Sequence, residues 1–179
     1  MNDEIFFRVA MEEAKIALKE GEVPVGAVIV KDGEIIGKGH NSVERLKDPT
    51  AHAEILAITA ATQKINNWRL SGSTIYVTLE PCLMCAGAII LSRIERIVFG
   101  AKDLRFGAFG SIFNIMGWEF NHKLIVKSGF FEEECSELMR IFFKSLRRNG
   151  GMTEWLKVHD SKSCDPYGSG GSNPSPSES

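Results

Sequence analysis

The chain has 179 residues, of which 44% are hydrophobic and 25% charged, and this balance predicts one globular domain with a hydrophobic core. The formal net charge of -2 excludes a protein that coats nucleic acid through overall basicity, so any such contact must depend on a local patch. No apolar run is long enough to span a bilayer, and the acidic start at residues 1–4 lacks a signal-peptide core. A cytoplasmic protein is therefore predicted.

The N-terminal part of the sequence predicts a helix, a hairpin and a second helix. Apolar side chains recur at helical spacing up to about Glu20, and Gly21 then ends the pattern. Two β-rich runs, residues 23–30 and 34–40, are joined by Lys-Asp-Gly, which is typical of a hairpin turn. Helical periodicity returns over residues 52–64.

The following part alternates strands with helices. Alternating side chains predict a strand at residues 74–79, and a continuous apolar stretch predicts a buried helix at 83–92. Short strands are expected at 96–99 and 123–127, with a glycine-rich loop (107–110) and a short helix between them, and a last helix covers 132–148. Because helical connections imply parallel strand pairs and the hairpin implies an antiparallel pair, we expect an α/β protein with a mixed five-stranded sheet between two helical layers.

The composition changes near residue 149. Serine, glycine and proline dominate the last residues, so we predict a folded domain at 1–149 and a disordered tail at 150–179. Residues 159–164 and 171–174 can be encoded by codons that resemble the anticodon arm and the T arm of a serine tRNA gene. We hypothesise that the reading frame runs into such a gene, whereas an ordinary flexible tail gives the same expectation for the protein.

Two short motifs together supply the ligands of a candidate zinc site: His-Ala-Glu at residues 52–54 and Pro-Cys-Leu-Met-Cys at residues 81–85. Each motif stands at a predicted helix start, where the helix dipole favours a thiolate. Cys82 and Cys85 are three residues apart and so share one side of their helix. With His52 they give three protein ligands, which leave a tetrahedral zinc ion one open position, as in catalytic sites.

Glu54 is then a spare carboxylate beside the open position. Zinc lowers the pKa of a water molecule, Glu54 takes the proton, and the hydroxide attacks a ring carbon that bears an amine. Glu54 then delivers the proton to the ring nitrogen and helps to expel ammonia. The alternative is a structural zinc site closed by His40, His122 or Cys135, although their spacing does not favour them.

Longer stretches of the sequence carry a family resemblance. They are residues 24–28, 51–54, 76–82, 84–89, 100–103, 107–111, 121–122 and 142–143. On them the chain, over about residues 4–148, resembles the bacterial tRNA-specific adenosine deaminases of the cytidine-deaminase-like zinc superfamily. The resemblance implies that superfamily's three-layer α/β/α fold, one Zn2+ per subunit and a homodimer. It also implies conversion of the wobble adenosine of an arginine tRNA to inosine, with the anticodon stem-loop as partner.

The resemblance also implies roles for residues outside the metal site. Asn41 matches a base-reading asparagine, whose amide can donate and accept hydrogen bonds; alternatively it is a turn residue at a strand end. Val25 and Ala27, with residues near 79–81, would wall a flipped-out base; the alternative is ordinary core packing, and both can hold. Asp103 matches a position near the substrate sugar, where a solvated loop acid is the alternative.

RNA contacts are expected from one loop and from the last helix. Basic side chains there can meet phosphates and aromatic ones can stack on bases. On the residues alone, a solvated charged face and core packing of at least one aromatic are the favoured alternatives. These candidates are Arg105, Phe142, Phe143, Lys144, Arg147 and Arg148. The helix at 83–92 is a candidate dimer surface.

Two other functions stay open on the sequence alone. One is a guanine or cytosine-nucleoside deaminase of the same superfamily, which would have a closed pocket and no RNA surface. The other is a non-catalytic, zinc-stabilised binding subunit, in which Glu54 would be dispensable.

Overall fold

The computed structural model describes residues 3–120 and 122–148. The predicted tail at 150–179, and with it the tRNA-gene hypothesis, lies outside these residues. The chain divides into two units, Met1–Lys144 and Ser145–Ser179, and the fold described below belongs to the first. Of the second unit, residues 145–148 are described as the last turn of a helix, α5 (Glu132–Arg148). No helix within the described ranges is both long enough and apolar enough to cross a membrane.

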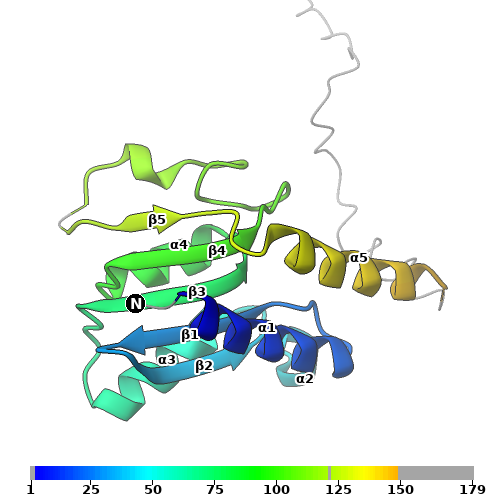
Figure 1. Cartoon of the computed structure of the whole chain (residues 1–179), viewed down its shortest axis with the longest axis horizontal. Helices are drawn as coiled ribbons and strands as arrows, with labels where there is room; N and C mark the ends of the chain where they lie inside the picture. The colour runs from blue at the N-terminus through cyan, green and yellow to red at the C-terminus, as the bar shows by residue number, and fades with distance from the viewer. Residues whose placement is uncertain (1–2, 121, 149–179) are drawn as a thin grey trace, which may run out of the picture. The chain divides into compact units, whose positions relative to one another are not determined.

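A single mixed sheet forms the centre of the first unit, with the strand order β2-β1-β3-β4-β5 (Figure 1). Its strands are β1 (Gly26–Lys31), β2 (Glu34–His40), β3 (Ser73–Leu79), β4 (Arg96–Ala101) and β5 (Ile125–Lys127). β1 is antiparallel to both β2 and β3, whereas β3, β4 and β5 are parallel. The predicted mixed five-stranded sheet is confirmed.

Helices cover both faces of this sheet, as the three-layer prediction requires (Figure 1). α1 (Asp3–Lys19) and the first turns of α5 pack on one face, and α3 (Ala53–Ile65) and α4 (Leu83–Leu91) pack on the other. Successive strand residues alternate between the two cores: Val28 and Tyr76 belong to the α1 side, and Ile29 and Val77 to the α3 side.

Several element boundaries differ from the prediction. β1 begins at Gly26 rather than at residue 23, because Pro24 has no N–H and the Val25 N–H donates to the carbonyl of Val23 at 2.7 Å. β5 is shorter than the predicted 123–127. The short helix expected before it is a single 3-10 turn, Ile115–Gly117, and α2 (Val43–Leu46) was not predicted.

The prediction that the helix at 83–92 is buried is wrong for one of its faces. Only Cys85, Ala86 and Ile89 of α4 are buried, because these positions face the sheet and α3. Leu83 and Leu91 lie on the exposed face, as does Met84. An all-apolar helix sequence therefore does not imply burial all round.

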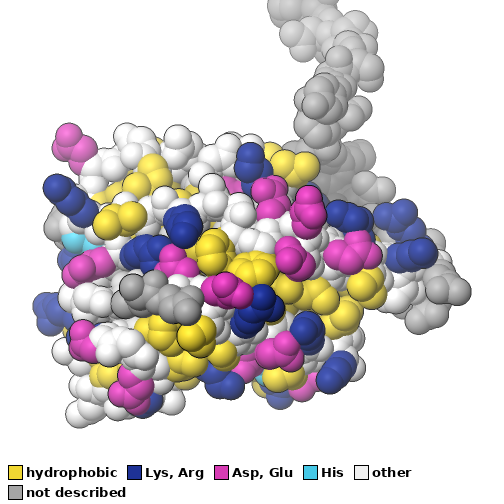
Figure 2. Space-filling model, in the orientation of Figure 1, with side chains coloured by type: hydrophobic (Ala, Val, Ile, Leu, Met, Phe, Trp, Pro, Cys, Tyr) yellow, Lys and Arg dark blue, Asp and Glu magenta, His cyan; other side chains and the backbone are white. Residues whose placement is uncertain are grey.

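The opposite face of the unit, which bears α1 and α5, mixes acidic, basic and hydrophobic side chains (Figure 2). A hollow of about 390 Å³ lies there between the two helices, and Met11 and Phe131 are among its lining residues. None of the residues of the two metal-ligand motifs lines it.

Candidate active site

The two motifs lie close together because both stand at helix starts on the same end of the sheet. β2 and β3 are both antiparallel to β1, so they run in the same direction and their carboxyl ends lie at the same end of the sheet. His52 stands immediately before α3, and Cys82 immediately before α4, both in extended backbone conformation. Cys85 lies in the first turn of α4. The fold therefore places a candidate site where strand carboxyl ends meet helix N-termini.

The three predicted ligands lie at distances that suit zinc. Nδ1 of His52 is 3.7 Å from Sγ of Cys82 and 3.4 Å from Sγ of Cys85. Tetrahedral geometry with Zn–N bonds of about 2.0–2.1 Å and Zn–S bonds of about 2.3 Å separates nitrogen from sulfur by about 3.6 Å. All three donor atoms lie within 4.8 Å of one another, and they form the one such group among the described residues. The donor set therefore fits a zinc ion.

The three residues considered as a fourth ligand have other contacts. His40 lies between the carboxylates of Glu13 and Glu20. His122 contacts Arg93 and the carbonyl of Ile94. Cys135 packs in the core on the α1 side, with its thiol 3.4 Å from the sulfur of Met11. No second cluster of three metal-ligating side chains forms around any of them in the described part of the chain.

The two thiols have unequal proton affinities. The hydrogen bond from Cys85 and the nearby His52 lower the pKa of Cys82 to about 4, against the effect of burial. The same hydrogen bond raises the pKa of Cys85, together with burial and the charge of Glu54. The interaction with Cys82 also raises the pKa of His52. Cys82 is therefore the more acidic of the two thiols, and zinc binding would deprotonate both.

Glu54 occupies the first turn of α3 and is only 3% exposed. Burial raises its pKa to about 7, although its hydrogen bond with the Cys85 thiol and the proximity of His52 oppose the shift. A carboxyl group beside the metal donors that exchanges its proton near neutral pH is suited to general acid–base catalysis.

Asn41 follows β2 and is buried beside a second acidic residue. Its backbone N–H donates to the carbonyl of Val25 at 3.0 Å, and its side-chain amide donates to Oε2 of Glu22 at 3.4 Å. Oε1 of Glu22 accepts the backbone N–H of Arg45 at 2.8 Å. Glu22 is 1% exposed and was not predicted as a site residue. The only sequence signal for Glu22 is its position directly after Gly21, the glycine that ends the first helix.

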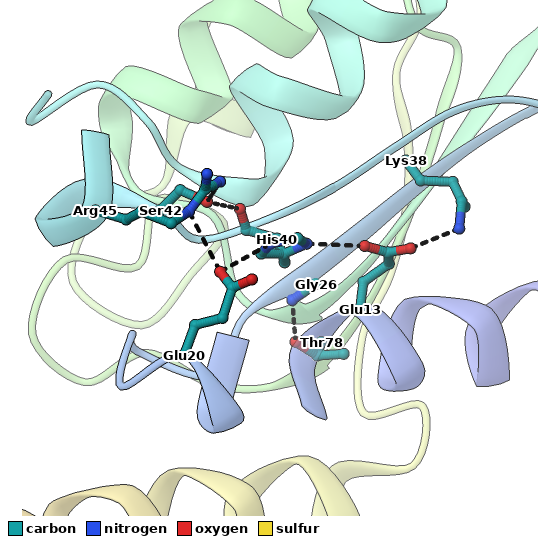
Figure 3. A network of polar contacts seen from close by, with 8 residues as sticks. All are labelled: Glu13, Glu20, Gly26, Lys38, His40, Ser42, Arg45 and Thr78. Atoms are coloured by element: carbon teal, nitrogen blue, oxygen red, sulfur yellow. Dashed lines mark hydrogen bonds and ion pairs between the residues drawn. The ribbon is translucent and has the colours of Figure 1, made fainter. Parts of the chain in front are cut away.

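A network of charges holds the strand that leads to Asn41 (Figure 3). The ring of His40 bridges Glu13, at 3.0 Å from Nδ1, and Glu20, at 3.3 Å from Nε2. Lys38 pairs with Glu13, and Arg45 with Glu20. Burial raises the pKa of Glu13, but the hydrogen bonds from Lys38 and His40 lower it by more. The pKa of Glu13 therefore lies below its usual value. The network thus ties α1 to β2 and α2.

The remaining predicted pocket residues have unequal access to a substrate. Val25 retains a little exposed surface, whereas Ala27 is fully buried in the core beneath α3. Asp103 is half-buried, and its Oδ1 accepts the backbone N–H groups of Arg105, at 2.9 Å, and Phe106, at 3.3 Å. Arg105 itself is exposed.

A buried carboxylate, from the stretch 79–81 that was predicted to wall the base, organises the loop that carries Asp103, which is a role that was not predicted. Glu80 precedes the Pro81-Cys82 pair and is 2% exposed. Its oxygens accept the backbone N–H groups of Asp103 at 3.2 Å, Phe109 at 2.8 Å and Ser111 at 3.2 Å, and also the Ser111 hydroxyl. An acidic residue between an apolar strand and a cysteine motif is the only sequence signal for it.

The candidate RNA contacts on α5 differ in their exposure to solvent. Phe142 is buried, whereas its neighbour Phe143 is partly exposed, and the two rings pack edge to face at 5.3 Å. Lys144 and Arg147 are exposed. The side chain of Arg148 lies outside the described structure.

Comparisons with known proteins point to one chemistry. A model of the MafB19-like deaminase family matches residues 1–147. A protein of Aquifex aeolicus named tRNA-specific adenosine deaminase is 55% identical over 151 residues, which are 83% of this chain and 99% of that protein. A structure from a study of A-to-I editing by tRNA A34 deaminases at the wobble position superposes with a TM-score of 0.73 at 42% identity, covering 75% of this chain and 99% of that one.

A guanine deaminase has a similar but less extensive match. The structure of the Bacillus subtilis enzyme superposes with a TM-score of 0.55 at 42% identity. The match covers 57% of this chain and 66% of that one. The same fold therefore also occurs in a deaminase whose name specifies a free base.

Proposed function

The chain belongs to the family of tRNA-specific adenosine deaminases, and from this membership we propose that it converts the wobble adenosine of an arginine tRNA to inosine. The water-derived oxygen replaces the amine of the ring, which leaves as ammonia. The observation that carries the proposal is the group of His52, Cys82 and Cys85 at zinc-compatible distances, with the buried carboxyl group of Glu54 beside it.

His52, Cys82 and Cys85 would hold one zinc ion per subunit. Zinc supplies Lewis acidity, which makes water a competent nucleophile at neutral pH. Three protein ligands leave room for solvent, and bound zinc would hold both cysteines at the start of α4 as thiolates.

Glu54 moves the protons of the reaction. It takes one proton from water as the oxygen bonds to the ring carbon that bears the amine, and passes this proton to the adjacent ring nitrogen. It then transfers the remaining hydroxyl proton to the amine, so that the carbon–nitrogen bond breaks and ammonia leaves. Both protons of the water are thereby used, one on the ring and one on ammonia, and Glu54 is regenerated.

The surrounding residues would bind the flipped-out base and the RNA. Asn41, held by Glu22, offers an amide to the purine edge, and Val25 provides an apolar wall with Ala27 behind it. Asp103, in the loop after β4, would lie beside the substrate sugar. The RNA-contact candidates with accessible side chains are Arg105, Phe143, Lys144 and Arg147, and we propose Arg148 as a further contact.

We also propose a cytoplasmic homodimer that forms through α4. Leu83, Met84 and Leu91 give this helix an exposed apolar face, which an aqueous monomer seldom leaves uncovered. Leu104 and Phe106 add exposed apolar side chains in the loop after β4. A second copy of the chain is the partner that the family resemblance implies.

Incubation of the purified protein with the anticodon stem-loop of an arginine tRNA tests the proposed activity. Sequencing should read guanosine in place of adenosine at the first anticodon base, with equimolar ammonia release. Guanine and cytidine serve as alternative substrates in parallel. Ammonia released from either of them, with the RNA unchanged, would reject the proposal in favour of a small-molecule deaminase.

A further inference from the structure

The segment from Asp103 to Ser111 is held against the metal-binding motif by one side chain. Glu80 accepts hydrogen bonds from both ends of the segment: Asp103 at its start, and Phe109 and Ser111 at its end. These contacts bridge 23 to 31 positions in the sequence. Glu80 is also only two residues from Cys82, so the same short stretch of chain carries a zinc ligand and the anchor of this loop.

The middle of the segment approaches the same motif. Gly107 forms an isolated β-bridge with Cys82, and the Ala108 N–H donates to the carbonyl of Pro81 at 2.9 Å. A β-carbon at Gly107 would lie 2.5 Å from the carboxyl carbon of Glu80. The loop is therefore closely fitted around the Glu80 carboxylate.

The loop carries two of the predicted substrate contacts, Asp103 and Arg105. The carboxylate of Asp103 in turn accepts the backbone N–H groups of Arg105 and Phe106, which orders the exposed part of the loop. A displacement of the Asp103 backbone would thus move several candidate substrate contacts together.

We propose that Glu80 is a positioning residue that holds the loop 103–111 in its substrate-binding conformation beside the zinc site, acting through backbone hydrogen bonds and without touching metal or RNA. The substrate part of this inference rests on the proposed deaminase function. Its physical basis is that backbone N–H groups shielded from water need an acceptor, and Glu80 supplies the acceptor for three N–H groups of this partly buried loop.

Glu80→Gln separates this role from general stability. A carboxamide of nearly the same shape has one accepting oxygen, so it can serve the pair formed by Phe109 and Ser111 or serve Asp103, but not both sides. The Ser111 hydroxyl can rotate to accept from the new NH2 group, whereas the Asp103 N–H cannot. The Asp103 end of the loop is therefore the end expected to lose its anchor.

The test measures three quantities on full-length Glu80→Gln: bound zinc, amide hydrogen exchange and deamination of the anticodon stem-loop. We expect one zinc per chain, exchange at Asp103 at least about tenfold faster than in the wild type, and kcat/KM for the stem-loop at least about tenfold lower. Asp3→Asn is the matched control, because it also removes a hydrogen-bonded carboxylate but near Arg96, at the opposite end of the sheet. It should leave loop exchange and kcat/KM unchanged.

Unchanged exchange at Asp103, or unchanged kcat/KM despite faster exchange, would overturn the proposal. An equal loss of kcat/KM in Asp3→Asn would also overturn it, since the effect would then be general destabilisation. If Glu80→Gln does not fold, Ser111→Ala removes only the hydroxyl donor and should give a smaller change in the same direction, about threefold; no change would count against the proposal. A wild type that leaves the RNA unmodified contradicts the deaminase function, while the exchange data still decide whether Glu80 anchors the loop.

Discussion

Gly39 of β2 lies directly against Ala53 of α3: a β-carbon at Gly39 would be 2.5 Å from the Ala53 carbonyl oxygen. It would also lie 2.7 Å from the backbone nitrogen of Ala57. The helix can approach the strand this closely only because residue 39 has no side chain. The contact fixes the first turn of α3, which carries Glu54 two residues after the metal-ligand position His52.

We therefore expect Gly39→Ala to disturb the metal site as well as the packing. The added methyl group would push against helix backbone, which cannot rotate away, and overpacking of this kind costs about 1–3 kcal/mol in the free energy of unfolding. Chemical denaturation measures that cost, and a competition titration with a zinc chelator measures zinc affinity. Both quantities should fall.

Gly37→Ala is the matched control for this prediction. A β-carbon at Gly37 would lie 2.4 Å from the carbonyl of Ala57, one helical turn farther from His52. A similar loss of stability with a smaller loss of zinc affinity is expected. Equal losses of zinc affinity in the two variants would show that the position of the first turn of α3 does not govern the site.

Glu54→Gln should abolish turnover while the protein still binds zinc. The amide keeps the shape of the buried side chain but cannot take up a proton, and loss of a general acid–base group costs about 10²–10⁴-fold in rate. The measurements are single-turnover deamination of the stem-loop and metal content by elemental analysis. Turnover close to that of the wild type would contradict the role of Glu54 and favour another proton carrier.

Local signals explain which parts of the site the sequence could predict. The ligands His52, Cys82 and Cys85 lie within two short motifs whose internal spacing is typical of metal ligands. Each motif also stands at a helix start, and the fold brings the two starts together. The anchoring role of Glu80 escaped prediction because its partners lie more than twenty residues away and are mostly backbone groups, which leave no mark on residue type. Glu22 escaped because its contact with the Asn41 side chain, 19 positions away, forms only in the folded chain.

The strand and helix pattern was predictable where periodicity was strong, as in β3 and the first helix. Burial of α4 was not, because every side of its sequence is apolar and periodicity cannot show which side packs. The start of β1 was also misplaced, since Val23 and Val25 are typical of strands whereas Pro24 between them cannot join the ladder.

Asp3→Asn should lower stability in a pH-dependent way. Asp3 forms two hydrogen bonds with the guanidinium of Arg96, at 2.7 and 2.8 Å, and accepts the Tyr76 hydroxyl at 2.9 Å. The bonds from Arg96 hold the pKa of Asp3 far below its usual value of 3.8, with smaller effects from Tyr76 and Lys127. Loss of this charged partner should reduce the free energy of unfolding by about 1.5–3 kcal/mol at neutral pH.

The sign of this pH dependence follows from the lowered pKa. A carboxyl group with a lower pKa in the folded state stabilises the fold fully above its unfolded-state pKa and loses that effect as the pH falls below it. The difference between wild type and Asp3→Asn should therefore be constant above about pH 5 and shrink below about pH 4. Urea denaturation across this range measures it, and a difference that grows on acidification would contradict the assignment.

Leu91→Glu tests the α4 surface as the dimer interface. Leu91 is 73% exposed at the end of the apolar helix, so a charge there should leave the folded subunit intact but oppose burial against a second copy. Replacement of a central interface residue typically weakens association by about 2 kcal/mol, or about 30-fold in Kd. Sedimentation at several concentrations should show a dimeric wild type and a variant shifted towards monomer. Ile5→Glu, on exposed α1, is the control expected to remain dimeric, and equal dissociation of the two variants would place the interface elsewhere.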